Sequence, residues 1–261
     1  MVRATTRLSL LFGALLVTLA AASTPVRADS IEAGAFLATT PSPREVNYPW
    51  MNRSRWFEMH AEDVALAEAG KADLVFIGDS ITEGWETTGA GPWSTHFAAR
   101  GAVNFGIGGD MTQNLLWRLD NGAASALDPD AVVLLIGVNN LNLSPEGAKE
   151  TALGIESVVG SLLERFPHAD LLLLAVFPTG AGPDHPTRAA VQAINTAIRP
   201  LGDLDRVTYL DLGDRFLETD GRLDASIMPD YLHLSELGYE RWAASILPWV
   251  EARVPLPAGS P

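Results

Sequence analysis

The sequence predicts an α/β fold: a doubly wound, mostly parallel sheet with helices on both of its faces. Five short runs are almost continuously apolar and rich in β-branched residues, as in strands that are buried on both faces. Helical segments separate these runs, and parallel neighbouring strands need such crossovers. Apolar residues make up 47% of the 261 positions, which is enough for the core of one full-sized domain.

The elements follow in alternation along the chain. An amphipathic helix is expected first, over 53–70, where apolar residues recur at helical spacing and Gly70 can end it. The strands are expected over 74–77, 102–105, 131–136, 171–177 and 207–210. The helices between and after them are expected over 93–99, 111–119, 145–166, 186–201 and 235–250.

The first residues have the pattern of a secretory signal peptide. Arg3 and Arg7 precede an apolar run of about fifteen residues, and Val26-Arg27-Ala28 has the small-x-small pattern that signal peptidase recognises. We therefore expect residues 1–28 to be a signal peptide and the protein to be secreted or periplasmic. The run is short for a membrane span, so we expect no stable membrane insertion after cleavage, and retention as an uncleaved anchor is the alternative.

Three further regions follow the predicted signal. Residues 29–48 contain prolines and no clean period, which indicates an extended N-terminal arm or linker. One folded domain is expected over 49–253. The last residues, 254–261, are rich in proline and glycine and are expected to form a flexible C-terminal tail.

The composition excludes several classes of function. The chain has no cysteine, which removes disulfides, thiolate metal sites, cysteine nucleophiles and lipid attachment at an N-terminal cysteine. Its net charge is −14, and cleavage after Ala28 would leave 15 basic residues against 32 acidic ones. Such an acidic surface repels phosphate backbones, so we expect no nucleic-acid partner. No GxxxxGK[ST] pattern is present, which disfavours a phosphate-binding function.

Polar residues follow three of the predicted strands. In open parallel sheets ligands bind beyond the carboxyl ends of the strands, so the loops there are where chemistry is expected. The three runs are Gly78-Asp79-Ser80, Gly106-Ile107-Gly108-Gly109-Asp110 and Gly137-Val138-Asn139-Asn140.

Ser80 is the candidate nucleophile. A serine directly after a buried strand, at the start of a short helix, projects its Oγ into the cleft and keeps its backbone N–H free. The alternative is that Asp79-Ser80 only caps a helix. A serine needs a base, and of the five histidines only His233 follows an acid, Asp230, that can reach Nδ1 within one turn and fix the tautomer.

Acyl transfer also needs hydrogen-bond donors for the oxyanion. The backbone N–H groups of Ser80 and Gly109 and the side-chain amide of Asn139 are the candidates, since each lies in a loop after a strand. For the glycines the alternative is turn chemistry that needs a positive φ, and for Asn139 an Asx turn. Asp79, Asn140 and Thr179 are candidates for substrate binding, the last because it follows the fourth predicted strand.

These blocks, together with Asp230-x-x-His233, resemble the SGNH hydrolases, also called the GDSL esterase/lipase family, over about residues 73–249. The second block, continued by Leu116-Trp117-Arg118-Leu119, is most similar to the platelet-activating-factor acetylhydrolase catalytic subunits and their bacterial relatives. The resemblance implies a flavodoxin-like three-layer α/β/α sandwich with strand order 2-1-3-4-5. It also implies the roles just given for the triad and the oxyanion donors. Ile81 and Val138 depart from the family pattern, where Leu and Thr are common.

The expected function is that of a serine esterase that hydrolyses short-chain esters, acetyl first, and that acts on carbohydrate if the chain is exported. No metal or other cofactor is expected. The alternatives are a lysophospholipase or acetylhydrolase that acts on lipid esters, and a non-catalytic glycan-binding module of the same fold. Trp85, Trp93 and Trp117 could stack on sugar rings, although such aromatic residues are more often part of the core. The oligomeric state is not predicted.

Overall fold

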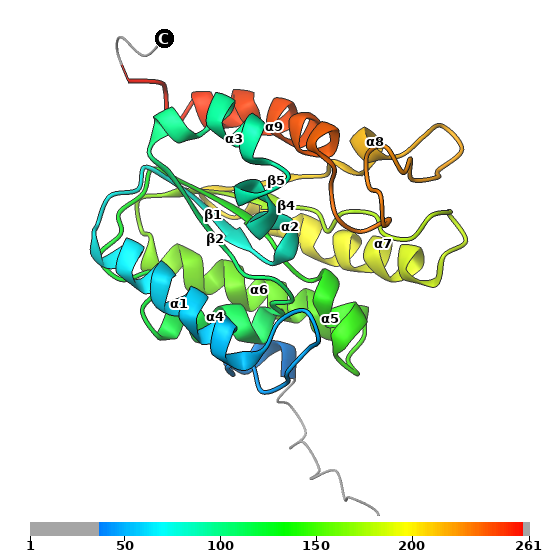
Figure 1. The fold of residues 1–261 in the computed structure, drawn as a ribbon, viewed down its shortest axis with the longest axis horizontal. Coiled ribbons are helices and arrows are strands. Elements are labelled where there is room, and N and C mark those ends of the chain that lie inside the picture. The colour runs from blue at the N-terminus through cyan, green and yellow to red at the C-terminus, as the bar shows by residue number, and fades with distance from the viewer. Residues whose placement is uncertain (1–36, 258–261) are drawn as a thin grey trace, which may run out of the picture. The chain divides into compact units, whose positions relative to one another are not determined.

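A five-stranded parallel sheet organises the protein. The computed structural model describes residues 37–257, which lie within the second of the chain's two units, Gly34–Pro261. The strand order is β2-β1-β3-β4-β5 and every pairing is parallel, which confirms the predicted fold and order (Figure 1). The strands are β1 Leu74–Gly78, β2 Ala102–Gly106, β3 Ala131–Leu135, β4 Asp170–Leu174 and β5 Val207–Leu210.

The central strands explain why their sequences are continuously apolar. Every residue of β1 and β3 is buried, because helices cover both faces of the sheet. The fourth strand is shorter than predicted, since the apolar run continues to Phe177 but the sheet pairing stops at Leu174. Beyond it the Asn195 side chain accepts from Val176 N–H at 2.8 Å and donates to Val176 C=O at 2.9 Å, which replaces a neighbouring strand.

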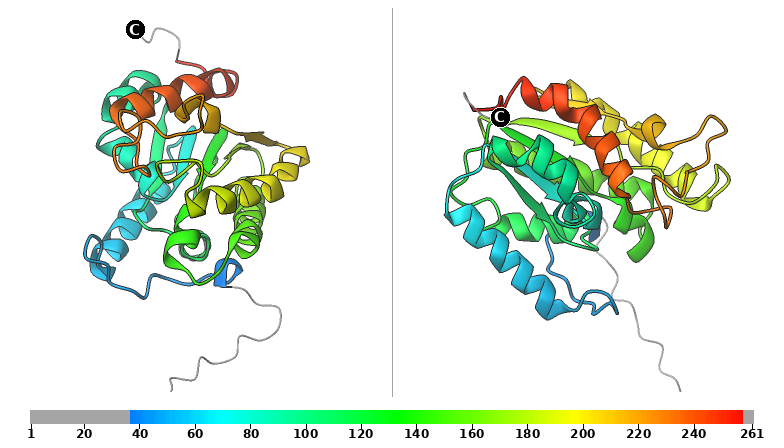
Figure 2. Two further views of the ribbon diagram at one scale, coloured as in Figure 1. Left: turned by 90° about the vertical axis from the view of Figure 1, so that its right-hand side faces the viewer. Right: turned by 45° about the horizontal axis from the view of Figure 1, so that its top comes forward.

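Helices form a layer on each face of the sheet, as the ribbon shows from three sides (Figure 2). One layer contains α1 Arg53–Glu68, α4 Thr112–Asp120, α6 Ala148–Arg165 and α7 Pro186–Ile198. The other contains α3 Ala90–His96, α8 Gly213–Phe216 and α9 Glu236–Glu251. Two short helices, α2 Ser80–Glu83 and α5 Val138–Leu143, follow β1 and β3 at the carboxyl end of the sheet. The 3-10 turns are Leu37–Thr39, Gly84–Glu86, Ala98–Arg100 and Arg199–Asp203.

The helix boundaries differ from the predicted ones where caps decide them. The helix predicted over 93–99 begins at Ala90, with Pro92 in its first turn, where a missing N–H does no harm. The helix predicted from residue 145 begins at Ala148, because Glu150 accepts a hydrogen bond from Gly147 N–H. The short helix α5 was not predicted, since Asn-rich segments read as turns.

The described part of the predicted arm packs against the domain. Ala38 is fully buried, its N–H donates to Glu146 Oε2 at 2.7 Å, and its C=O accepts from Thr112 Oγ1 at 2.8 Å. The contacts fasten this segment to α4 and to the connection before α6. The predicted signal peptide, residues 1–28, lies outside the described residues, as do residues 258–261 of the predicted tail. Within the described range, no helix has the length and hydropathy to span a membrane.

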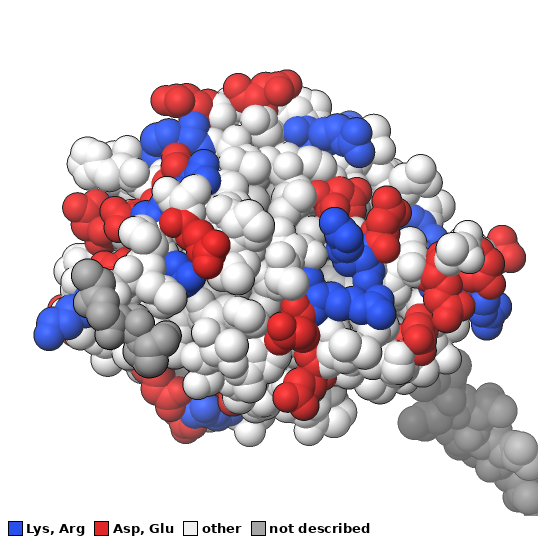
Figure 3. All heavy atoms as spheres, turned by 90° about the horizontal axis from the view of Figure 1, so that it is seen from above, with Lys and Arg blue, Asp and Glu red and all other residues white. Residues whose placement is uncertain are grey.

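Charges of both signs are interspersed on the face formed by α3 and α9 (Figure 3). His96 Nε2 lies 3.1 Å from Glu240 Oε1, and Arg100 Nη2 lies 3.1 Å from Glu251 Oε1, so a polar contact and an ion pair link α9 to the segment around α3. This face presents no wide area of basic charge.

Candidate active site

Ser80 lies at the carboxyl end of β1, an interior strand of the sheet. The strand ends at Gly78, where a side chain has no room: a Cβ would lie 2.2 Å from Leu135 C=O and 2.3 Å from Thr82 Oγ1. Asp79 then caps α2 by accepting a hydrogen bond from Ile81 N–H at 3.0 Å. Ser80 is the first helical residue, so its backbone N–H has no partner within the helix and its half-buried side chain faces a pocket.

His233 reaches Ser80 from a loop that is far away in the sequence. The Oγ atom of Ser80 lies 2.9 Å from Nε2 of His233. On the other side of the ring, Nδ1 lies 2.7 Å from Asp230 Oδ2, while Asp230 Oδ1 accepts from His233 N–H at 2.7 Å. Tyr231 lies between them in the left-handed region, with φ of 61°, which is uncommon for a bulky residue. This tight turn folds the carboxylate back onto the imidazole.

The electrostatics keep Asp230 ionised. Burial raises the pKa of this carboxyl, but the hydrogen bonds from His233 and Leu232 outweigh burial, and the net pKa is below the usual value for aspartate. With Nδ1–H donating to a carboxylate, Nε2 is free to accept a proton from Ser80.

The other four histidines are engaged elsewhere or exposed. His60 is buried against Trp56 and Trp117, and His96 pairs with Glu240. His168 and His185 are exposed, as the sequence indicates. Among the five, only His233 has a hydrogen bond to Ser80 within the described residues.

The proposed oxyanion donors lie on the same pocket. Gly109 and Asn139 line it together with Ser80. Gly109 has φ of 74°, and its N–H makes no hydrogen bond within the described residues. The Asn139 amide donates one hydrogen to Asp110 C=O at 3.0 Å, which orients the side chain and leaves its second hydrogen available. The three donors therefore come from the three loops that the sequence singled out.

A buried ion network holds the loop that carries Gly109. Arg118 is fully buried; its Nη1 donates to Asp110 Oδ2 and its Nη2 to Asp63 Oδ2, both at 2.6 Å. Asp110 also accepts from Trp56 Nε1 at 2.6 Å. The network fixes Asp110, which directly follows Gly109, so it holds the backbone of the loop 106–110 in place.

The pocket has a volume of about 400 Å³ and includes residues that sequence reasoning did not single out. Trp50 and Met51 from the N-terminal segment, Glu83 from α2, Asn142 and Leu143 from α5, and Leu232 complete its lining. Glu83 Oε2 accepts from Gly108 N–H at 2.6 Å, and burial raises the pKa of this carboxyl. No sequence periodicity marks Trp50, because it lies in an irregular segment.

The three predicted substrate-binding residues are placed elsewhere. Asp79 and Asn140 are 1% and 0% exposed, and neither they nor Thr179 line the pocket. The Asp79 carboxylate caps α2, Asn140 binds Thr112 and Gln113 of α4, and the Thr179 hydroxyl lies 3.0 Å from that of Thr187. Each side chain is bonded within the fold and none lines the pocket at Ser80, so their role in substrate binding stays a prediction.

The tryptophans considered for sugar stacking belong to the interior. Trp85 is fully buried, Trp93 packs against the main core, and Trp117 packs with Trp56 in a smaller cluster. None of the three lines the pocket at Ser80.

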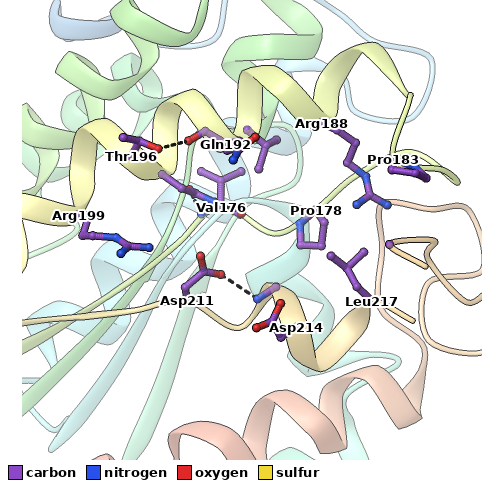
Figure 4. Close-up of a pocket in the computed structure, with 14 residues that line it drawn as sticks. Val176, Pro178, Pro183, Arg188, Gln192, Thr196, Arg199, Asp211, Asp214 and Leu217 are labelled. Atoms are coloured by element: carbon purple, nitrogen blue, oxygen red, sulfur yellow. Dashed lines mark hydrogen bonds between the residues drawn. The ribbon is translucent and has the colours of Figure 1, made fainter. Parts of the chain in front are cut away.

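A separate depression of about 420 Å³ lies between α7 and the connection from β5 to α8 (Figure 4). Its polar side chains include Arg188, Gln192, Asp211 and Asp214, but neither Ser80 nor His233. The loop 178–183, which Arg188 ties down through hydrogen bonds to Thr179 and Gly180, contributes to this hollow and not to the pocket at Ser80.

The site offers a serine hydroxyl, an imidazole with a free Nε2, a carboxylate behind it and converging N–H donors. Those are the parts that nucleophilic acyl transfer uses. Among the described residues, no group of three or more His, Asp or Glu side chains is arranged to hold a metal ion.

Comparisons with known proteins show which family the sequence is similar to. A family model described as the GDSL-like Lipase/Acylhydrolase family matches residues 76–241. Platelet-activating factor acetylhydrolase IB subunit alpha1 of Homo sapiens is 37% identical over 186 residues, which cover 71% of this chain and 78% of that protein.

Solved structures share the fold. A GDSL-like lipase from Bacteroides thetaiotaomicron superposes with a TM-score of 0.62 at 22% identity, covering 75% of this chain and 97% of that chain. An acetylxylan esterase from Geobacillus stearothermophilus superposes with a TM-score of 0.56 at 20% identity, covering 69% of this chain and 93% of that chain.

Proposed function

Because the chain belongs to the GDSL-like lipase/acylhydrolase family and is a carboxylic ester hydrolase, we propose that it is a serine esterase that removes short acyl groups through an acyl-enzyme on Ser80. The observation that carries this proposal is the chain of contacts from Ser80 Oγ to His233 Nε2 at 2.9 Å and from His233 Nδ1 to Asp230 Oδ2 at 2.7 Å. The three side chains lie on two loops that only the fold brings together.

The mechanism has two steps. His233 takes the hydroxyl proton as Ser80 attacks the ester carbonyl, and Asp230 stabilises the imidazolium. The negative charge on the carbonyl oxygen is stabilised by donors from Ser80, Gly109 and Asn139, each of which contributes about 2.7–4 kcal/mol if it acts as oxyanion-hole donors usually do. The alcohol leaves with the proton from His233, and water then attacks the acyl-enzyme with His233 again as the base.

We propose acetyl esters of carbohydrate as the substrate class. Support comes from the charge of the chain, which has 32 acidic against 18 basic residues. This charge disfavours binding to anionic surfaces but does not oppose binding to neutral polymers. An acetylxylan esterase shares the fold, and the predicted signal peptide would bring the enzyme to extracellular polysaccharide. Secretion or periplasmic export is itself a proposal, and sequencing the N-terminus of the mature protein from culture or periplasm tests it.

A lipid ester is the second candidate, because the platelet-activating factor acetylhydrolase subunits are 37% identical over 186 residues. A lysophospholipid or acetylated phospholipid would need to pass its long chain over Met51, Leu143 and Leu232, the apolar residues of the pocket.

The experiment compares p-nitrophenyl esters of two to eight acyl carbons, with wild type and Ser80→Ala. We expect the highest kcat/KM for acetate and a loss of at least about 10⁴-fold in the variant. Ser245→Ala, which removes a hydroxyl bonded within α9, is the matched control and should keep full activity. Equal turnover by wild type and Ser80→Ala would sink the nucleophile assignment, and a maximum at eight carbons would favour a long-chain lysophospholipid over an acetyl ester.

A further inference from the structure

One wall of the active-site pocket comes from outside the part of the chain that the family match covers. Trp50 and Met51 line the pocket with Ser80 and His233, whereas the match begins at residue 76. The segment that supplies them, residues 42–51, is named the arm wall. Because the arm wall lines the same pocket as Ser80 and His233, it is positioned to select the substrate.

Trp50 is the largest exposed surface of the arm wall. Trp50 is 57% exposed. Its indole ring is stacked on the ring of Tyr48, with the two centroids 4.8 Å apart and the two planes within 2° of parallel. Since Tyr48 covers one face of the indole, the exposed area belongs to the opposite face and the edges. A Cβ added to Gly109 would lie 2.3 Å from Trp50 Cη2, so the far edge of the indole rests on the backbone of an oxyanion donor.

Arg44 fixes this aromatic pair to the site. Its side chain is 3% exposed and its Nη2 donates to Gly108 C=O at 2.6 Å. The guanidinium carbon lies 5.5 Å from the Tyr48 ring centroid and 5.8 Å from that of Trp50. The platform is therefore held in place before a ligand arrives, which lowers the entropy lost on binding. The nearby Arg44 charge also disfavours a second cation, such as a choline headgroup, on the same rings.

A second hollow adjoins the active-site pocket beside the arm wall. Its volume is about 370 Å³, and it shares Leu143 with the pocket at Ser80. Tyr48 lines this second hollow, whereas Trp50 lines the first, so one ring of the stacked pair faces each. Its lining includes the neutral polar residues Ser42, Gln113, Asn114 and Ser144, the charged Arg44 and Glu45, and apolar residues such as Val46, Met111 and Pro145. Aromatic faces next to neutral hydrogen-bonding groups suit sugar rings, which have apolar C–H faces and polar rims.

We propose that the arm wall is a glycan-binding subsite, in which Trp50 stacks on the sugar ring at the scissile acetyl ester and the second hollow takes the next ring of the chain. An acetyl group fills only a small part of a pocket of about 400 Å³, so the remainder is available to the alcohol portion of the ester. The subsite rests on the proposed function, because it needs Ser80 to act on an acetylated carbohydrate.

The test compares two acetyl esters that share the reacting group. Acetylated xylotetraose has sugar rings, and triacetin has none. We expect Trp50→Ala to lower the ratio of kcat/KM for xylotetraose acetate to that for triacetin by about tenfold, mainly through KM, since an aromatic face and its buried area are lost. Trp50→Phe should restore most of this ratio. Leu66→Ala, at an exposed apolar residue of α1 outside both hollows, should leave the ratio unchanged.

Several results would overturn the subsite. Equal losses on both esters would mean that Trp50 acts only on the oxyanion loop, and an unchanged ratio would mean that it does not touch the sugar. The subsite would also be rejected if the wild type hydrolysed triacetin but not xylotetraose acetate. It would be rejected too if Trp50→Ala lowered kcat/KM for acetylcholine, a cationic acetyl ester, more than kcat/KM for xylotetraose acetate. If the wild type hydrolysed triacetin no faster than Ser80→Ala, the esterase proposal itself would fail, so the two failures are distinguishable.

Discussion

Oδ2 of Asp230 lies 2.7 Å from Nδ1 of His233, and Oδ1 of the same carboxylate accepts from the backbone N–H of His233. One carboxylate thus fixes both the ring and the turn that carries it. The aspartate side chain is 57% exposed and the imidazole 44%, so water shares in solvating the pair. The main contribution of Asp230 is therefore to hold the tautomer and orientation of His233.

Removing the base should cost more activity than removing the acid behind it. We expect His233→Ala to lose kcat about as far as Ser80→Ala, because the two residues act as one unit. Asp230→Ala should lose about 10²-fold to 10⁴-fold, since water can replace part of its solvating role. Steady-state kinetics with p-nitrophenyl acetate measure the loss of kcat in each of the three variants. Near-normal activity in His233→Ala would show that another base serves Ser80.

A side chain at position 109 should lower activity, whereas a side chain at position 160 should stabilise the protein. Gly109 has φ of 74°, and an added Cβ would meet Trp50 at 2.3 Å. We expect Gly109→Ala to lower kcat about 10²-fold to 10³-fold by displacing an oxyanion donor. Gly160 lies inside α6 with no atom within 4 Å of an added Cβ, so Gly160→Ala should stabilise the protein by about 0.5–1 kcal/mol and leave kcat unchanged. Steady-state kinetics and thermal unfolding of both variants test these two expectations. Unchanged kcat in Gly109→Ala would show that the Gly109 N–H is not an oxyanion-hole donor.

The sheet and its flanking helices were predictable because burial on both faces leaves continuous apolar runs in the sequence. The contact between Asp230 and His233 was predictable because an acid three positions before a histidine needs only a local turn. The orientation of neighbouring polar residues was not. Asn139 and Asn140 are adjacent on α5, and successive helical residues point about 100° apart. One amide therefore lines the pocket and the other binds α4, and only the packed structure shows which.

Trp50 escaped prediction for a different reason. It lies in a segment without helical or strand periodicity, and its importance comes from contact with Gly109 on a distant loop. Long-range contacts of irregular segments leave no local pattern. Of the tryptophans that sequence proximity pointed to, Trp85 is buried in the core, and Trp93 and Trp117 are partly buried against core clusters.

Arg118 should be more important to stability at neutral pH than at acid pH. Its removal leaves Asp63 and Asp110 buried without their partner, which costs about 3–5 kcal/mol for a broken buried pair. Burial already raises the pKa of Asp63 to about 7 despite Arg118, and loss of the cation raises it further. At low pH both carboxyls can take up a proton and lose their charge, so the difference between wild type and Arg118→Ala should shrink as pH falls from 8 to 5. Denaturant unfolding at the two pH values measures it, and a constant difference would indicate lost packing alone.

Asp79 should make the stability of the wild type fall as pH rises toward neutrality. Burial raises the pKa of this carboxyl to about 7 from 3.8, and its Oδ2 atom is buried without a hydrogen-bond partner among the described residues. Between these two values the folded state binds a proton that the unfolded state has released. The slope of unfolding free energy against pH is therefore negative there, and stability present below pH 4 is lost as pH rises through about 7.

Asp79→Asn keeps a side-chain oxygen to cap Ile81 N–H but cannot ionise. Relative to wild type, the variant should gain stability between pH 4 and pH 8, up to about 4 kcal/mol. Parallel pH profiles of the two proteins would instead show that Asp79 is solvated in the folded state.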